Sequence, residues 1–293
     1  MMDSHVVNFF LEHLSVERRC SQHTIVSYTT DLKQFSDFLA ENHAATPITQ
    51  ASSKQIREWM VHLSDQSIEN RSINRKLASL RTFFKFLLQR GYVQQNPLLP
   101  IRTVKTSKKL PLFLRETEMA EIAPSDGEEP TFENLRDDLI IYLLYGTGMR
   151  LAELLRLERA NINLSQGTLR VLGKRNKERV IPIPLLLLKQ IQSYLSACPF
   201  TSTYLIVDNK GKPVYPMFIQ RIVKKQLSKI STLEKLSPHV LRHTYATHLL
   251  NNGADLNAIK ELLGHANLAA TQVYTHNSME KIKETYAQAH PKA

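Results

Sequence analysis

The stretch Ser237-Pro238-His239-Val240-Leu241-Arg242-His243-Thr244 organises the rest of the chain. Ser237 is a favourable helix N-cap residue, and Pro238 suits the first helical position. The helix is expected to end near Gly253, a residue type common just after a helix end. At about 100° per residue, Tyr245 and Leu249 share a flank with Leu241, which predicts the core side of this helix.

The other side of the same helix carries positive charge. His239 lies nearly opposite Leu241, with Arg242 and His243 on either side of it. Free backbone N–H groups and the helix dipole already favour an anion at a helix start. The stretch therefore predicts a phosphate site. A zinc pair of His239 and His243 is the alternative, but Val240 stands where such a motif has Glu, so we expect no metal.

Composition narrows the class of protein. The chain has 293 residues, 42% hydrophobic and 22% charged, which fits about two globular domains. A net charge of +11 suggests a polyanionic partner, above all nucleic acid. Cys20 and Cys198 are far apart and predict no disulfide, which fits a reducing compartment. No signal sequence or membrane span is evident, so we expect a cytoplasmic protein with no membrane contact.

Residues 5–90 show apolar residues at three- and four-residue steps, which predicts four helices in a bundle. The fourth helix, between Asn70 and Arg90, contains six basic and no acidic residues. An ordinary solvated helix usually mixes the two signs. We therefore favour a DNA-backbone surface over a merely solvated face. The basic residues are Arg71, Arg75, Lys76, Arg81, Lys85 and Arg90.

Residues 1–98 are thus predicted to form a helical DNA-binding domain, followed by a basic linker over 99–111. Prolines punctuate this linker, and its charges, which include Lys105, are all positive. Two interpretations stay open: an extended connection that touches DNA, or a plain solvated one.

Residues 112–293 predict a mixed helical and strand domain with a C-terminal tail. We expect two short strands joined by a turn over 173–177, a third strand, and several helices. Between Asp208 and Glu234 every charged residue is basic, and Lys224 belongs to this DNA-contacting group. The expected strands are 168–172, 179–182 and 204–207, and the expected helices are 132–145, 185–197, 217–230 and 256–263.

Four further residues join the opening helix as candidates for chemistry. Arg150 follows the Gly146-Thr147-Gly148 break and starts a helix. Lys174 sits at a hairpin tip, where a long side chain can reach into a site. His265 follows Gly264, and Tyr274 comes nine residues later in Gln272-Val273-Tyr274-Thr275-His276.

These motifs resemble the tyrosine recombinase (phage-integrase-like) family, in particular its Xer-type chromosome-dimer resolvases. They occur in the order and spacing of that family, and the likeness extends over nearly the whole chain. Two departures are Arg175, where Gly often follows the hairpin lysine, and Ala152, where Ser is frequent. The matching stretches are 145–154, 173–179, 239–244 and 263–265 leading to 274–276.

The resemblance implies a mainly α-helical protein with a small β-sheet, and an enzyme that cuts and rejoins DNA. The resemblance implies that Tyr274 is the nucleophile and would form a 3′-phosphotyrosyl link. A phenol with a pKa of about 10 is ionised in roughly one molecule in a thousand at neutral pH. His239 and His265 are candidates for the base that helps it, and Lys174 is placed to protonate the leaving 5′ oxygen.

The charge on the transition state needs cations, and Arg150 and Arg242 can each bind a non-bridging oxygen bidentately, in place of metal ions. No cofactor is expected. For His243 two roles stay open, ordering the site or packing.

Partners implied by the resemblance are double-stranded DNA, a homo- or heterotetramer with a related recombinase, and a septal DNA translocase. The tail from Ser278 to Ala293 would then pack on a neighbouring subunit, or alternatively on its own domain. Three other functions are weighed: an integrase of a plasmid, phage or transposon, a type IB topoisomerase, and a DNA-binding protein without catalysis.

Overall fold

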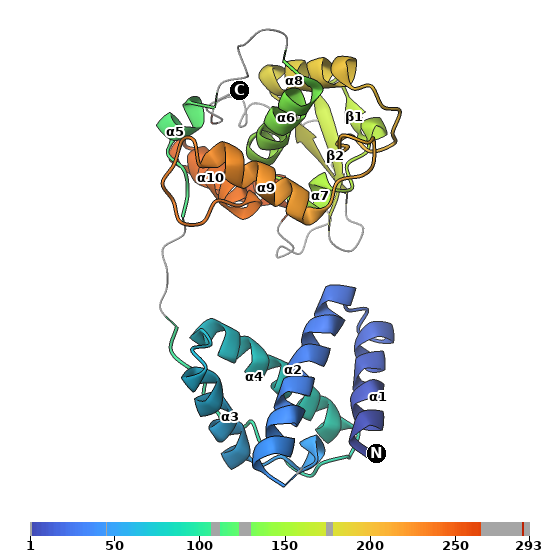
Figure 1. Ribbon diagram of the computed structural model, residues 1–293, viewed down its shortest axis with the longest axis vertical. Coiled ribbons are helices and arrows are strands. Elements are labelled where there is room, and N and C mark those ends of the chain that lie inside the picture. The colour runs from blue at the N-terminus through green and yellow to red at the C-terminus, as the bar shows by residue number, and fades with distance from the viewer. Residues whose placement is uncertain are drawn as a thin grey trace. The chain divides into compact units, whose positions relative to one another are not determined.

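The computed structural model describes residues 2–44, 46–106, 112–122, 130–173, 178–264 and 289. The chain divides into two compact units, Met1–Lys109 and Leu110–Ala293 (Figure 1). Each unit has its own apolar core. None of the helices in the described ranges is long and apolar enough to cross a membrane.

Unit 1 is the predicted four-helix bundle, in which α2 packs against α1, α3 and α4 (Figure 1). Its core includes Trp59 and Phe35, whose ring centroids are 4.8 Å apart. The predicted cap at Ser21 is confirmed, because its side chain accepts from the backbone N–H of Thr24. The helices are α1 (Met2–Val16), α2 (Gln22–Asn42), α3 (Ser53–Asp65) and α4 (Asn70–Gln89), with a 3₁₀ turn at Ile48–Gln50.

The first part of the predicted linker lies along α4. The Asn74 side chain bonds to both the N–H and the C=O of Val104, at 2.9 and 2.8 Å. Arg81 donates to the carbonyl of Ile101 at 2.8 Å, and Asn70 donates to that of Lys105 at 2.9 Å. Residues 101–105 therefore run as an extended segment fixed to unit 1.

Unit 2 is built around α6 (Phe132–Thr147), whose residues from Arg136 to Thr147 are all buried. It packs against α8 and α10, and more lightly against α7 and α9 (Figure 1). The other helices are α5 (Glu116–Ala120), α7 (Leu151–Leu154), α8 (Leu185–Ala197), α9 (Pro216–Leu227), α10 (Pro238–Asn251) and α11 (Leu256–Leu263), with a 3₁₀ turn at Arg159–Asn161.

The sheet of unit 2 has three antiparallel strands in the order β1-β2-β3. The predicted hairpin is confirmed, with Leu172 opposite Glu178 and Thr168 opposite Pro182. A mainly helical fold with a small sheet is thus what the sequence predicts. The strands are β1 (Ile162–Asn163), β2 (Thr168–Leu172) and β3 (Glu178–Pro182).

The predicted third strand at 204–207 is wrong. That segment makes only isolated bridges, Glu158 with Tyr204 and Val207 with Pro213. Residues 205–207 are all buried rather than alternating. The apolar run that suggested a strand is therefore core filling, and the short segment Ile162–Asn163 pairs with β2 instead.

Gly148 lets α6 and α10 approach closely. Its backbone has a φ of +59°, and a Cβ there would lie 2.4 Å from Cδ1 of Tyr245. Only glycine adopts this left-handed conformation without cost and also leaves room for the ring. The glycine break of the sequence is therefore a packing device that places the residues after it.

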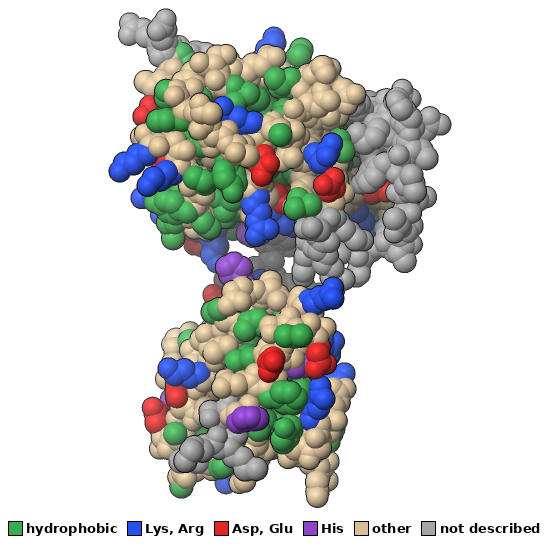
Figure 2. All heavy atoms as spheres, turned by 90° about the vertical axis from the view of Figure 1, so that its right-hand side faces the viewer, with side chains coloured by type: hydrophobic (Ala, Val, Ile, Leu, Met, Phe, Trp, Pro, Cys, Tyr) green, Lys and Arg blue, Asp and Glu red, His purple; other side chains and the backbone are tan. Residues whose placement is uncertain are grey.

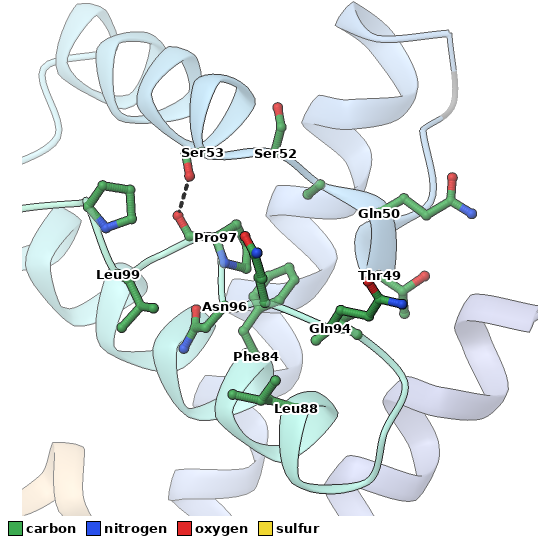
Figure 3. Close-up of a pocket in the computed structure, with 14 residues that line it drawn as sticks. Thr49, Gln50, Ser52, Ser53, Phe84, Leu88, Gln94, Asn96, Pro97 and Leu99 are labelled. Carbon is green, nitrogen blue, oxygen red and sulfur yellow. Dashed lines mark hydrogen bonds between the residues drawn. The ribbon is translucent and has the colours of Figure 1, made fainter.

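Unit 1 also holds a pocket of about 740 Å³. It opens between the start of α3, the end of α4 and the segment 93–100 (Figure 3). The hydroxyl of Ser53 donates to the carbonyl of Pro97 at 2.6 Å at its edge. None of the described residues that line the pocket is charged.

Candidate active site and nucleic-acid interface

Helix α10 presents its two flanks as the sequence predicts. Leu241, Tyr245 and Leu249 have no exposed surface, which confirms the core side. His239 is exposed and Arg242 partly exposed on the other side. Ser237 and Pro238 take the N-cap and first helical positions, although the Ser237 side chain makes no capping hydrogen bond.

Arg150 stands at the N-cap of α7 and is held there by Glu153. The Glu153 carboxylate accepts from the backbone N–H of Arg150 at 2.8 Å and from its Nη1 at 2.9 Å. Arg179, on β3, donates to both oxygens of the same carboxylate at 2.8 Å. Glu153 and Arg179 are buried, so one interior carboxylate orients two guanidinium groups.

The end of α11 ties a third guanidinium group into this cluster. Carbonyl groups at a helix C-terminus lack intrahelical partners and carry partial negative charge, which suits cations. Three successive carbonyls there each accept from a different arginine. The pairs are Leu262 with Arg179 Nε at 2.8 Å, Leu263 with Arg242 Nη2 at 2.6 Å, and Gly264 with Arg150 Nη2 at 3.2 Å.

Arg242 is also fixed from a second direction, because its Nη1 donates to the carbonyl of Gly148. Segments more than 90 residues apart in the sequence therefore meet at Arg150 and Arg242. Three arginines and one glutamate leave the cluster with two net positive charges. It is a cationic site built from planar, preorganised donors.

The pKa values reflect this crowding. Burial alone raises the pKa of the Glu153 carboxyl, but hydrogen bonds and charge from Arg179 and Arg150 outweigh it and lower the pKa to about 2. Burial, and then the nearby positive charge of Arg150, lower the pKa of Arg242 to about 10. Both groups are charged at neutral pH, so the cluster keeps its net positive charge.

Glu153 and Arg179 are not among the site residues that the sequence predicts. Glu153 lies three residues after Arg150, which is the spacing at which a side chain reaches back to an N-cap. Arg179 lies on the buried side of β3, two residues before buried Ile181. A basic residue at an inward position of a strand needs a buried partner, so this position indicates that a partner exists but not that it is Glu153.

Three of the predicted catalytic residues lie outside the described residues: Lys174, His265 and Tyr274. Lys174 belongs to the connection between β2 and β3. His265 directly follows Gly264, whose left-handed backbone (φ +63°) ends α11. Of the six, the described part of the chain thus brings together Arg150 and Arg242, with His239 one turn before Arg242 on α10.

Helix α10 is anchored to the segment that enters unit 2. The backbone N–H of Leu114 donates to Oγ1 of Thr244 at 3.0 Å, and Nε2 of His248 donates to the Leu114 carbonyl at 2.7 Å. In a neutral ring, Nδ1 of His248 then accepts from the Tyr145 hydroxyl, 2.9 Å away. These bonds hold the arginine-bearing helix at both α6 and the incoming chain.

His243 lies against Phe113, with ring centroids 6.4 Å apart in an edge-to-face arrangement. It is partly buried. Of its two open roles, this contact favours packing.

The basic residues of α4 separate into three environments. Arg71, Arg75 and Lys85 are exposed and lie on one stripe of the helix. Lys76 is buried and pairs with Asp31, so the structure does not place it on that surface. Arg81 is partly buried and holds the linker carbonyl of Ile101.

Elsewhere, Lys105 and Lys224 are exposed. Helix α9, which carries Lys224, contains no acidic residue, and its Arg221 donates to the hydroxyl of Tyr215. On the side of the molecule in Figure 2, basic and acidic side chains are interspersed in both units, as on an ordinary solvated surface. Helices whose charged residues are all basic are exceptions to this mixture, namely α4 and α9.

Of the predicted tail, residues 278–293, the structure describes only Ala289. Ala289 is buried, and its carbonyl accepts from Nδ2 of Asn252 at 2.9 Å. At this position the chain packs on its own domain. The other residues of the predicted tail, 278–288 and 290–293, lie outside the described residues.

Comparison with known proteins places the whole chain. Residues 113–281 match the model of the phage integrase family, and residues 7–91 match the phage integrase N-terminal SAM-like domain. The chain belongs to the phage integrase family. Both units thus correspond to domains of this family, and the resemblance seen in the motifs is confirmed.

Curated relatives in this family match over nearly their full length. The tyrosine recombinase XerC of Pelobacter propionicus is 40% identical over 98% of this chain and 95% of its own. The XerC of Chlorobaculum parvum is 36% identical over 97% of this chain and 94% of its own. As a member of this family at such similarity, the protein is a tyrosine recombinase, an enzyme of site-specific DNA recombination.

Solved structures of phage integrase family proteins share the fold. A XerH site-specific recombinase bound to a palindromic difH substrate, in a post-cleavage complex, superposes with a TM-score of 0.73 at 22% identity, covering 92% of this chain and 81% of the other. A lambda integrase dimer bound to a COC′ core site gives 0.68 at 19% identity, covering 93% and 97%. At these identities the likeness concerns the fold.

Proposed function

We propose that this enzyme cuts and rejoins double-stranded DNA at a defined site, with Tyr274 as the nucleophile and Arg150 and Arg242 as the phosphate-binding pair. The observation that carries the proposal is the cluster at the end of α11. There, carbonyls of Leu262, Leu263 and Gly264 and the carboxylate of Glu153 hold three guanidinium groups in place. Two net positive charges at one point suit the charge that develops on a phosphorus under attack.

The chemistry follows from the residue types. The phenolic oxygen of Tyr274 attacks the phosphorus, a phosphorus–tyrosine bond forms, and the bond to the 5′ oxygen breaks. His239 or His265 takes the phenolic proton, and Lys174 gives a proton to the leaving 5′ oxygen. Attack of another 5′-hydroxyl on the phosphotyrosine reverses these steps, so no ATP is consumed. The guanidinium groups supply the positive charge, and the proposal includes no metal and no cofactor.

DNA binding is assigned to α4 and α9. Arg71, Arg75 and Lys85 form the exposed stripe of α4, and Lys105 is exposed on the segment that lies along the same helix. Lys224 is exposed on α9. Basic residues with no acidic residue among them are suited to successive phosphates.

The biological role proposed is resolution of chromosome dimers during chromosome segregation, in the cytoplasm. It is supported by relatives named XerC at 36 to 40% identity. In this role the enzyme would act as a tetramer with copies of itself or a related recombinase, together with a septal DNA translocase. Crosslinking of the full chain on DNA tests the tetramer, and the same experiment with a chain ending at 277 tests the tail. Loss of the crosslinked species on truncation supports a tail that packs on a neighbour, and its persistence contradicts that role of the tail.

A nicked suicide substrate tests the catalytic proposal. A nick beside the cleavage site lets the short 5′ product diffuse away and traps the protein on DNA. The expected result is a covalent protein–DNA adduct that protease digestion removes. A protein that binds the same DNA and never forms an adduct would be a binding protein without catalysis, and relaxation of supercoils without a defined site would indicate a topoisomerase.

A further inference from the structure

A buried carboxylate lies beside the basic stripe of α4. Asp31, in the middle of α2, has no exposed surface. It accepts from Arg75 Nη1 at 2.5 Å and Nη2 at 2.8 Å, from Ser79 Oγ at 2.7 Å and from Lys76 Nζ at 3.3 Å. An interior carboxylate with so many donors is fully satisfied, so its geometry is fixed.

The two cationic side chains that pair with Asp31 differ in how exposed they are. Lys76 is buried, and its ammonium also donates to Gln34. The side chain of Arg75 is 49% exposed. Lys76 therefore neutralises Asp31 in the interior, whereas Arg75 extends from the carboxylate to the surface.

Arg75 keeps part of its hydrogen-bonding capacity. A guanidinium group has five N–H donors. Nη1 donates to Asp31 and to Ser27 Oγ at 2.7 Å, and one N–H of Nη2 donates to Asp31. Nε–H and the second Nη2–H have no partner among the described residues. These two donors lie on one edge of the planar group, the arrangement that binds two oxygens of a phosphate.

We propose that Asp31 is a positioning residue for DNA binding: it holds the guanidinium group of Arg75 so that the Nε–Nη2 edge is presented to a backbone phosphate. The inference rests on the proposed DNA-binding role of α4. Positions 71, 75, 78, 82 and 85 follow one another at three- and four-residue steps, so Arg75 lies on the same stripe as Arg71 and Lys85.

The proposal makes a prediction opposite in sign to simple electrostatics. Replacing a carboxylate by a neutral group raises the net charge by one, which by itself strengthens binding to DNA. Release of Arg75, however, adds the cost of ordering a long side chain on binding, and this loss outweighs the gain. The variant Asp31→Asn is therefore expected to bind a mixed-sequence DNA duplex about 2- to 10-fold more weakly.

Asp37→Asn is the matched control for charge. Asp37 lies on the same helix and is exposed. This variant makes the same change in net charge and should bind DNA as tightly as the parent or more tightly. If Asp31→Asn also binds as tightly as the parent, the proposal is wrong.

Two further variants guard against misfolding, since Asp31→Asn leaves Lys76 buried without its counter-charge. Lys76→Met removes the interior ammonium and leaves Asp31 with Arg75, so the affinity for DNA should stay within about 2-fold of the parent. Asp31→Asn with Lys76→Met removes both interior charges, leaves the net charge of the chain unchanged, and should still weaken binding. Thermal melts establish which variants are folded at the assay temperature.

Arg75→Lys keeps both the charge and Asp31. A single ammonium cannot chelate the carboxylate and also offer a two-donor edge, so the proposal predicts weakening close to that of Arg75→Ala. Binding by Arg75→Lys equal to that of the parent would overturn it even if every Asp31 variant failed to fold.

A double-mutant cycle separates positioning from general support of the fold. When Arg75 is already Ala, Asp31→Asn should no longer weaken DNA binding, and affinity should stay the same or rise because of the added net charge. An equal loss in both backgrounds means that Asp31 acts only on the fold and overturns the inference. If Arg75→Ala alone leaves affinity unchanged, the assignment of Arg75 to the DNA-binding surface fails instead.

Discussion

Glu153 orients two of the three guanidinium groups in the cationic cluster, those of Arg150 and Arg179. Its two oxygens accept from Nη1 and Nη2 of Arg179 and from Nη1 of Arg150, and so orient both groups toward the end of α11. Removing one partner of a buried ion pair typically costs about 3–5 kcal/mol, because the other charge stays buried without compensation. Glu153 thus links the stability of unit 2 to the placement of its phosphate-binding groups.

The variant Glu153→Gln tests this link through the pH dependence of unfolding. The pKa of Glu153 in the folded protein is about 2, below its ordinary value of 4.5. The ionised group therefore stabilises the fold above about pH 4.5, and this contribution, about 3 kcal/mol, is lost as the pH falls toward 2. Denaturant unfolding between pH 2 and 6 should show a smaller dependence on pH in Glu153→Gln than in the parent.

A neighbouring acid provides the control. Glu178→Gln changes an exposed carboxyl on the same strand as Arg179 and should keep the parent's pH dependence. An unchanged acid slope in Glu153→Gln would mean that the buried pair does not hold the cluster.

At the scale of elements, the turn between α6 and α7 packs against α10 and positions Arg150 at the start of α7. Gly148 ends α6 with a left-handed backbone, lies against Tyr245, and offers its carbonyl to Arg242. Gly148→Ala should destabilise unit 2 by well over the roughly 1 kcal/mol that a positive φ costs alone, because a Cβ would overlap the buried ring. Strand cleavage should fall further than DNA binding, since the carbonyl that Arg242 donates to moves.

Gly253→Ala is the matched comparison. Gly253 has a φ of +85°, and a Cβ added there would meet nothing within 4 Å, so only the backbone strain applies. Chemical denaturation of the two variants measures the difference. Equal losses of stability would show that contact with Tyr245 contributes nothing.

Elements stabilised by local patterns can be predicted from the sequence, whereas those that depend on long-range packing cannot. The amphipathic helices and the β2–β3 hairpin follow from local periodicity and turn residues. The predicted bounds of α8 and α11 match the structure, whereas the helix predicted at 217–230 ends at Leu227 and that at 132–145 extends to Thr147. The prediction of a strand at 204–207 is wrong because a short apolar run fits a strand and a buried loop equally well. Which of the two forms depends on the elements that pack against the segment, and these are not visible in the local sequence. The order of the motifs indicated the family before any contact was known.

Long-range contacts were beyond local reasoning. The charge of Lys76 fitted a basic helix face, but only the packing of α2 on α4 shows that it is paired with Asp31 in the interior. The same holds for Arg179, whose partner Glu153 lies 26 residues away. Buried ion pairs of this kind become visible when the elements that carry them are placed against one another.

At the scale of the whole molecule, the net charge of +11 is distributed unevenly. Exposed basic residues on α4 predict a salt-dependent interaction, since each phosphate neutralised adds about 0.9 to the slope of log affinity against log salt. The double variant Arg71→Ala, Lys85→Ala should therefore bind DNA more weakly and reduce that slope by about 2. Lys76→Met loses a positive charge from the interior and should leave the slope unchanged.

Titration of a mixed-sequence duplex at several salt concentrations makes this measurement. The difference in slope between variants cancels effects that are common to all of them. A slope that is the same in the double variant and in the parent would remove α4 from the DNA-binding surface.

The proposed mechanism requires that distant segments of one chain meet at a DNA phosphorus, which arginines stabilise while a tyrosine takes over the ester bond. Peptide mapping of the digested adduct, after trapping on a nicked substrate, identifies the amino acid that is attached to DNA. The expected result is phosphotyrosine at Tyr274, and no adduct from Tyr274→Phe despite unchanged DNA binding. An adduct on another residue, or one that persists in Tyr274→Phe, would show that the mechanism is wrong.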